Sequence, residues 1–192
     1  MSDYSTLIFI GLPHSGKSST AKNLSVNGGF KHINIGEILR DVIKNKSDLP
    51  AYEEILKVVS DGENVSDSIV VGLIEKKLKS FKNNDIIMDG FPRELNSLPA
   101  FYGLMSDCDR NFSKITVCHF IIDEKNSIKL NKKRRREMNL KSDSFDKRYY
   151  NFKNKEIPLL SLMKSAHDFL ELKFESGEEY NVSLIKERIN EY

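Results

Sequence analysis

One short stretch near the N-terminus constrains the fold more than any other feature of the sequence. Residues 11–18 read Gly-Leu-Pro-His-Ser-Gly-Lys-Ser, a complete match to the phosphate-loop pattern G-x-x-x-x-G-K-[ST]. An apolar run over residues 4–10 predicts a buried parallel strand before the motif, and residues 17–26 carry side chains compatible with a helix after it. A phosphate loop requires this strand–loop–helix setting, so a chance glycine turn with a solvated lysine is the weaker interpretation.

The chemistry of the motif explains its spacing. Glycines let successive backbone N–H groups turn inward to form an anion-binding nest, and the helix N-terminus adds a partial positive charge. Lys17 is placed to reach the outer phosphates of a nucleotide, and the hydroxyl of Ser18 or Ser19 to face the phosphates or their Mg²⁺. The motif predicts nucleotide binding, but it does not specify a reaction.

Strand and helix patterns alternate along the rest of the chain. Further strands are predicted over residues 32–35, 85–88, 116–122 and, nearer the sheet edge, 169–174. Helices are predicted over residues 36–44, from Pro50, from Ser66 as N-cap, and over residues 125–136, 146–166 and 182–189, with Pro158 kinking the long one. No internal repeat or Pro/Gly-rich linker divides the sequence. The alternation predicts one three-layer α/β domain with a parallel sheet.

Composition narrows the class of protein. The 192 residues include 30 basic and 28 acidic ones, a balance that argues against a strong attraction to nucleic acid or an anionic membrane. Two cysteines, Cys108 and Cys118, cannot form a disulfide scaffold and fit a reducing compartment. No apolar run approaches the roughly 20 residues of a membrane helix, and the N-terminus lacks a signal-peptide pattern. We therefore expect a soluble, cytoplasmic monomer without nucleic-acid or membrane partners.

A second motif follows a later strand. Asp89, in the string Ile-Met-Asp-Gly-Phe-Pro-Arg at 87–93, would emerge at the carboxyl end of its strand, beside the phosphate loop. A carboxylate there can hold Mg²⁺ directly or through water, and Arg93 is a fork donor suited to phosphate. Standing alone, the motif would be better explained as an ordinary turn with a solvated arginine. It is accompanied by Arg40 and Arg148 from other segments, and together they indicate phosphate chemistry.

With these motifs the sequence resembles the adenylate kinase and UMP/CMP kinase family. Gly-x-Pro-x-x-Gly-Lys at 11–17, Ile-Gly-Glu-Ile-Leu-Arg at 35–40 and Asp-Gly-Phe-Pro-Arg at 89–93 follow the order and spacing of that family. The resemblance covers nearly the whole chain. It implies a P-loop NTPase fold and an enzyme that transfers the γ-phosphoryl group of ATP to a nucleoside monophosphate, with Mg²⁺ as cofactor.

The resemblance also implies the organisation of the chain and its site. Residues 1–192 would form a single kinase domain, with a helical monophosphate-binding arm over residues 35–66 and a short lid over residues 134–143 without cysteine-bound zinc. The implied ATP contacts are Gly11, Pro13, His14, Ser15, Gly16, Lys17, Ser18, Ser19 and Arg135. The implied monophosphate contacts are Ile35, Gly36, Arg40, Val65, Gly90, Arg93 and Ser97. Lys17, Arg93 and Arg148 would be catalytic, and Ser18 and Asp89 would hold Mg²⁺, directly or through water.

Several residues depart from the family pattern. His14 replaces a glycine of the phosphate loop, where its side chain would either crowd the phosphates or point to solvent. Ile35 and Ser97 replace residues that read the base, and Lys141 and Ser144 alter the lid. AMP is the first candidate acceptor by family, and UMP or CMP the next. Two alternatives remain, a P-loop kinase for another small acceptor and a nucleotide-binding protein without turnover. The three retained arginines favour the monophosphate kinase.

Other clusters have ordinary explanations. The basic run at 132–136 is expected to be a charged helix end beside the lid, because no aromatic residues interleave with it to stack on bases. The four histidines show no metal-binding spacing. We expect His119, Tyr149, Tyr150 and Phe152 to pack in the core.

Overall fold

Five parallel strands form the centre of the molecule. The computed structural model describes residues 4–45, 51–60, 65–81, 83–137, 145–173 and 187. In sheet order the strands are β2 (Lys31–Asn34), β3 (Ile86–Asp89), β1 (Thr6–Gly11), β4 (Ile115–Ile121) and β5 (Asp168–Lys173), and every pairing is parallel. All five predicted strands are present, with β5 at an edge as expected. The α/β class with a parallel sheet is therefore confirmed.

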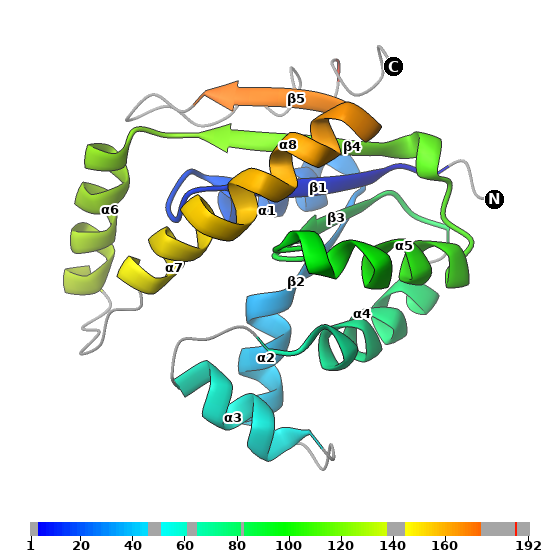
Figure 1. Cartoon of the computed structure of the whole chain (residues 1–192), viewed down its shortest axis with the longest axis horizontal. Coiled ribbons are helices and arrows are strands. Elements are labelled where there is room, and N and C mark those ends of the chain that lie inside the picture. The colour runs from blue at the N-terminus through cyan, green and yellow to red at the C-terminus, as the bar shows by residue number, and fades with distance from the viewer. Residues whose placement is uncertain are drawn as a thin grey trace.

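Alternate residues of the strands face two separate apolar layers, because successive side chains of a strand point to opposite faces. On one face Leu7 and Phe9 of β1 pack with residues of α1 (Lys17–Gly28). On the other, Ile8 and Ile10 belong to a larger cluster with α4 (Asp67–Ser80), α5 (Leu98–Asp107) and α8 (Ile157–Ala166). Figure 1 shows α8 crossing in front of the sheet and α1 behind it. The predicted three layers are thus present.

Two helices project from the sheet below β2 (Figure 1). The helix α2 (Ile35–Lys44) starts directly at the end of β2, where the side chain of Asn34 caps it by accepting from the backbone N–H of Glu37 at 2.9 Å. It packs against α3 (Tyr52–Ser60), and both bury apolar residues, Val42 and Ile55 among them. These helices make up most of the predicted monophosphate arm. Residues 46–50 and 61–64 of that arm lie outside the described residues.

The predicted long helix over residues 146–166 is present but is not uniform. It consists of α7 (Phe145–Asn151), a π-helical turn (Phe152–Glu156) and α8. Pro158 lies in the first turn of α8, where its missing N–H and its ring prevent a regular α-helical bond to the preceding turn. The wider π turn accommodates this defect, and such turns are frequent at functional sites.

The sequence patterns missed one helix. The helix α5 was not predicted from the sequence, although Leu98, Phe101, Leu104 and Met105 repeat at helical spacing and are all buried. Pro99, in the first turn of that helix, was a second available signal. The helix packs against α4 and fills the layer beside β3.

Three local expectations have different outcomes. Tyr150 is 63% exposed, so its assignment to the core is wrong, whereas Phe152 is buried. His119 is only partly buried, so its place in the core is confirmed only in part: its ring lies 6.4 and 6.3 Å from those of Phe152 and Phe169, and burial lowers its pKa. Ser66 occupies the N-cap position of α4, but its hydroxyl donates to Glu54 at 3.3 Å instead of capping the helix.

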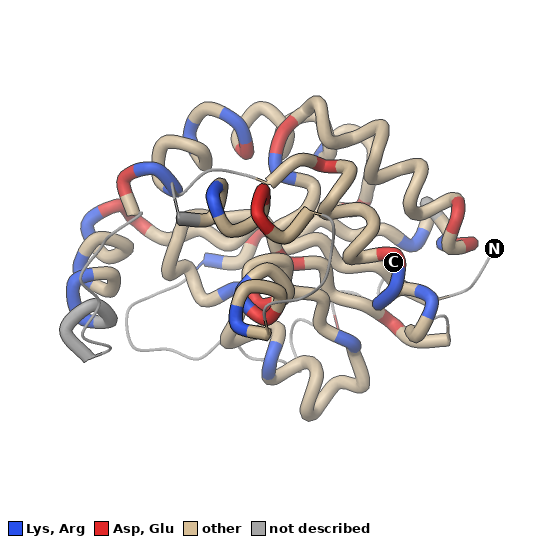
Figure 2. The backbone as a smooth tube through the Cα atoms, turned by 90° about the horizontal axis from the view of Figure 1, so that it is seen from below, with Lys and Arg blue, Asp and Glu red and all other residues tan. Residues whose placement is uncertain are grey.

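The predicted basic helix is α6 (Glu124–Glu137), which follows β4. Figure 2 shows its run of basic residues at the left of the molecule, with acidic and basic residues mixed elsewhere. The side chains of 134–137 and all of 138–144 lie outside the described residues, which covers the predicted lid. Of the predicted helix over residues 182–189 only Glu187 is described. Within the described ranges, no helix combines the length and apolar character needed to cross a membrane. The remaining elements are 3₁₀ turns at Leu95–Ser97 and Phe112–Lys114.

Candidate active site

The phosphate loop joins β1 to α1 and curls around the ammonium group of Lys17. Nζ of Lys17 donates to the carbonyl oxygens of Gly11 and Leu12 at 2.6 and 2.8 Å. Gly16, the N-cap of α1, has a φ of 92°, a conformation that glycine adopts without strain. A Cβ atom at Gly11 would collide with the carbonyl oxygen of Phe120 on β4. The glycines of the motif are therefore required by the shape of the loop.

Charged groups from several segments surround Lys17. Burial lowers the pKa of the Lys17 ammonium, the carboxylates of Asp89 and Glu156 oppose this, and the guanidinium groups of Arg93 and Arg148 reinforce it. Arg93, from the segment after β3, and Arg148, from α7, thus both lie close enough to Lys17 of α1 to influence its charge. A group of like charges of this kind is stabilised by a polyanion, which indicates a site for phosphate groups.

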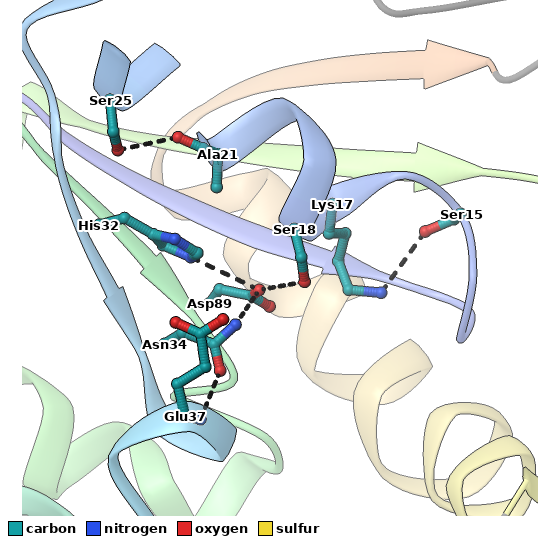
Figure 3. A network of polar contacts seen from close by, with 9 residues as sticks. All are labelled: Ser15, Lys17, Ser18, Ala21, Ser25, His32, Asn34, Glu37 and Asp89. Atoms are coloured by element: carbon teal, nitrogen blue, oxygen red, sulfur yellow. Dashed lines mark hydrogen bonds and ion pairs between the residues drawn. The ribbon is translucent and has the colours of Figure 1, made fainter. Parts of the chain in front are cut away.

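Asp89 ends β3 and lies next to the phosphate loop because β3 pairs with β1. Its Oδ2 accepts from Oγ of Ser18 at 3.1 Å and from Nδ2 of Asn34 at 2.9 Å, and it lies 3.6 Å from Nε2 of His32 (Figure 3). Burial would raise the pKa of Asp89, but His32, Lys17 and Ser18 outweigh burial and hold the pKa below its usual value. An ionised carboxylate beside a hydroxyl supplies the oxygen ligands that Mg²⁺ prefers. Ser18 and Asp89 therefore fit the predicted metal.

Two glycines near Asp89, Gly90 and Gly36, leave room for two guanidinium groups. Nε of Arg93 donates to the carbonyl oxygen of Gly90 at 2.7 Å, and a Cβ atom at Gly90 would lie 2.9 Å from Nη2 of Arg93. The same Cβ would lie 3.5 Å from Cβ of Ile35, and a Cβ at Gly36 would lie 3.3 Å from Nη1 of Arg40. Five of the predicted monophosphate contacts are thus gathered at the junction of β2, α2 and the segment after β3.

The other two predicted monophosphate contacts are buried. Val65 belongs to the same apolar cluster as Ile35. Ser97 lies in the turn before α5, and its hydroxyl donates to Oδ1 of Asp67 at 3.1 Å. Since a serine hydroxyl has one hydrogen, this bond leaves Ser97 only its lone pairs for a ligand.

Comparison with known protein families matches a family model for adenylate kinase to residues 9–168. The chain belongs to the adenylate kinase family. Its parallel sheet and phosphate loop are the P-loop NTPase fold of that family, as the sequence resemblance implied.

Individual adenylate kinases match shorter stretches of the chain. The protein from Borrelia duttonii (strain Ly) is 38% identical over 124 residues, which are 64% of this chain and 54% of the relative. The protein from Mycoplasma mobile is 45% identical over 92 residues, 47% of this chain and 42% of the relative. The protein from Synechococcus sp. (strain RCC307) is 32% identical over 118 residues, 62% of this chain and 63% of the relative. The chain spans about half the length of the Borrelia relative that it matches.

All but one of the ATP contacts predicted from the family resemblance lie along one continuous segment; the exception is Arg135. Gly11 to Ser19 form the phosphate loop and the first turn of α1, where Ser15 is buried and Ser19 is exposed. Arg135 stands near the end of α6, and its side chain lies outside the described residues, as do the altered lid residues Lys141 and Ser144. The roles of all these residues in binding and catalysis stay predictions.

His14 behaves differently from both expectations for it. Its side chain neither crowds the loop interior nor points to solvent. Nε2 of His14 lies 2.9 Å from Oδ1 of Asn131 on α6, and its ring stacks on Phe145 of α7 with ring centroids 6.2 Å apart. Its φ of 65° is left-handed, a conformation that costs a non-glycine residue about 1–2 kcal/mol. The backbone angle turns the side chain away from the nest and toward these helices.

The sequence analysis missed Glu156, which lies in the π turn. Its carboxylate accepts from the backbone N–H of Gly11, and burial raises its pKa, opposed by Arg93 and Lys17 and reinforced by Asp89. A signal for it existed, because residue 156 falls on the core-facing stripe of Phe152, Leu159 and Met163. An acid in an apolar stripe requires an explanation, and the neighbouring cations supply one. Asn34 and His32, the other partners of Asp89, were also missed.

Proposed function

We propose that the chain is an ATP-dependent nucleoside monophosphate kinase of the adenylate kinase type, with AMP as its preferred acceptor. The observation that carries the proposal is the convergence of Lys17, Arg93 and Arg148 from three distant segments, next to Asp89. Transfer of a phosphoryl group between two anions depends mainly on positioning and on neutralising charge, and this group of side chains can do both.

Each cation has a place in the proposed reaction. An oxygen of the acceptor phosphate attacks the γ-phosphorus of ATP, the bond from that phosphorus to the β,γ-bridging oxygen breaks, and ADP leaves with the bridging oxygen. Lys17 holds the outer phosphates of ATP in the loop. Arg40 and Arg93 hold the acceptor phosphate, and Arg148 bridges the two phosphate groups. Ser18 and Asp89 would hold Mg²⁺, directly or through water, and the ion would supply further neutralisation of the negative charge of ATP.

The arm and the lid have separate roles in this proposal. The helix α2, which packs against α3, carries both Gly36 and Arg40 toward the acceptor. A lid over residues 134–143 would exclude water, which otherwise accepts the phosphoryl group. The choice of AMP over UMP and CMP rests on the name adenylate kinase shared by the relatives. The near balance of charge argues against nucleic-acid or membrane partners, and the two cysteines, too few for a disulfide scaffold, support a reducing compartment such as the cytoplasm. A monomer is part of the same proposal.

A coupled assay of nucleoside diphosphate formation tests the proposal. The full chain is supplied with Mg²⁺, ATP and, in turn, AMP, CMP, UMP and GMP. We expect turnover with AMP exceeding that with the other three. Arg40→Ala and Arg93→Ala should raise the KM of the monophosphate more than that of ATP, since each removes a charge-assisted hydrogen bond of about 1.5–3 kcal/mol. The activity would be refuted if no acceptor yielded a diphosphate. A selective loss of ATP binding in both variants would mean that the ATP and monophosphate subsites are assigned the wrong way round.

A further inference from the structure

The helix α6 holds two consecutive residues of the phosphate loop. Ser127 and Asn131, one helical turn apart on α6, are both buried although both are polar. Oγ of Ser127 donates to the carbonyl oxygen of Pro13 at 2.6 Å, and Oδ1 of Asn131 lies 2.9 Å from Nε2 of His14. An amide oxygen can only accept a hydrogen bond, so Nε2 of His14 is the donor. One face of α6 is therefore bonded to the loop at two points.

The helix α7 contacts the same loop residue. The ring of His14 stacks on Phe145 with an interplanar angle of 20°, and Phe145 stacks in turn on Tyr149 with centroids 6.1 Å apart. The hydroxyl of Tyr149 donates to Glu124, at the start of α6, at 2.6 Å. The loop, α6 and α7 thus all contact one another. Within the loop, His14 contacts both helices.

The backbone of His14 has a conformation that is uncommon for a residue with a side chain. Its φ of 65° lies in the left-handed region, which glycine adopts freely and a residue with a side chain adopts only under strain. Strained residues persist where the surrounding structure holds them in place, and they concentrate at ligand sites. Here Asn131 and Phe145 are what hold the side chain. A glycine at this position would leave the loop free to take other shapes.

We propose that His14 is a positioning residue for ATP, which holds the phosphate loop in its binding shape by fixing it to α6 and α7. The proposal rests on the proposed function for the identity of the nucleotide. Its physical basis is that a loop ordered in advance loses less conformational freedom when the triphosphate binds, which raises affinity. His14 acts through the loop backbone and does not touch the reacting atoms.

The test is equilibrium binding of Mg²⁺ and the non-hydrolysable β,γ-imido analogue of ATP, measured by calorimetry on the full chain. His14→Gly removes the ring and relieves the backbone, Asn131→Ala removes the acceptor, and the double variant combines them. We expect each single variant to raise the Kd about three- to tenfold, the effect of one lost hydrogen bond. The double variant should raise the Kd no further than His14→Gly alone, since the bond between His14 and Asn131 is already lost in His14→Gly.

Tyr149→Phe is the matched control. It removes the bond between α6 and α7 without touching the loop, and it should change the Kd less than twofold. The KM of the monophosphate should stay unchanged in all these variants, whereas a general loss of structure would raise it. Thermal unfolding verifies that each variant folds. If His14→Gly does not fold, the Kd of Asn131→Ala alone tests the role of His14.

Several results would overturn the role of His14. One is a Kd for His14→Gly equal to or below that of the original chain. Another is a double variant in which the two effects on the binding free energy add in full. A third is a change of Kd in Tyr149→Phe as large as that in His14→Gly. Failure of the proposed function looks different. A chain that binds the ATP analogue with the expected pattern but transfers no phosphoryl group refutes the kinase activity and supports the role of His14. A chain that turns over while the variants bind ATP normally refutes only the role of His14.

Discussion

Lys17 is already held in place by its own loop, because its ammonium group bonds the carbonyl oxygens of Gly11 and Leu12. Removing it deprives the phosphates of a positioned charge, so we expect Lys17→Ala to lower kcat by about 10²–10³-fold or more, the effect of losing one preorganised donor. Lys22→Ala is the control, since Lys22 lies on the same helix and is exposed. The coupled diphosphate assay measures both. Undiminished turnover by Lys17→Ala would show that the loop is not catalytic.

Glu156 gives the pH dependence of stability a predictable sign. Burial raises its folded-state pKa above the ordinary value of 4.5, so above that pH the folded state keeps a proton that the unfolded state loses. The protonated form of Glu156 therefore stabilises the folded state. This stabilisation is present below pH 4.5 and is lost as the pH rises from 4.5 through the folded-state pKa, because ionisation favours unfolding. Glu156→Gln retains one side-chain oxygen that can accept a hydrogen bond, and its amide does not ionise.

We therefore expect Glu156→Gln to be more stable than the original chain at pH 7, with a difference that shrinks toward pH 4.5. Urea unfolding across this range measures it. The opposite order at pH 7 would mean that pairing of the Glu156 carboxylate with Lys17 and Arg93 outweighs its burial.

Ser97 and Ile35 are the residues predicted to face the base in the proposed function. The hydroxyl hydrogen of Ser97 is used by Asp67, and isoleucine offers no side-chain hydrogen bond. Sites built on hydrogen bonds reject wrong bases strongly, whereas an apolar contact discriminates by only about 1–3 kcal/mol. We expect kcat/KM for AMP to exceed that for CMP and UMP by less than about a thousandfold in the monophosphate panel. A larger ratio would show that backbone groups or ordered water read the base.

At the scale of helices and strands, periodicity predicted most of the fold and failed where a neighbour decides the outcome. The five strands and the helices α1, α2 and α6 follow from apolar patterns and glycine stops. The π turn before Pro158 does not, because a proline predicts a kink without giving its form. Ser66 has the composition of a cap, but its hydroxyl bonds Glu54, a residue on a different helix. Contacts between elements are not readable from the local pattern of either element.

The missed helix α5 provides a test of packing. Phe101 of α5 is fully buried in the apolar cluster that also contains residues of α4 and α8. Phe101→Ala should therefore lower the free energy of unfolding by about 3–5 kcal/mol. Leu162→Ala on α8 is the control, because Leu162 is 50% exposed and its loss should change stability by about 0.5 kcal/mol or less. Urea unfolding measures both. Equal small effects would mean that α5 contributes little to the core.

At the scale of the whole molecule, the sheet assembles the candidate site. The motif residues Lys17, Asp89 and Arg93 were predictable because parallel strands end at one edge and the pairing of β1 with β3 brings them together. Glu156 and the partners of His14 were not, because they reach the loop from α6, from α7 and from a π turn, all more than 100 residues later in the sequence. Motif spacing carries no information about such contacts.

This long-range assembly predicts that nucleotide binding stabilises the entire domain. In the proposed function the loop, the end of β3 and the helix α7 must all be in place to bind Mg²⁺-ATP, so the ligand is expected to bind only the folded chain. Mg²⁺-ATP analogue at 100 times its Kd should add about 2.7 kcal/mol, which raises the Tm by roughly 5–11 °C in a domain of this size. Phe101→Ala should lower the starting Tm and keep the rise, since it lies away from the loop, whereas Lys17→Ala should lose most of it. Thermal unfolding with and without the analogue measures all three proteins. A full rise in Lys17→Ala would mean that the nucleotide binds somewhere other than the phosphate loop.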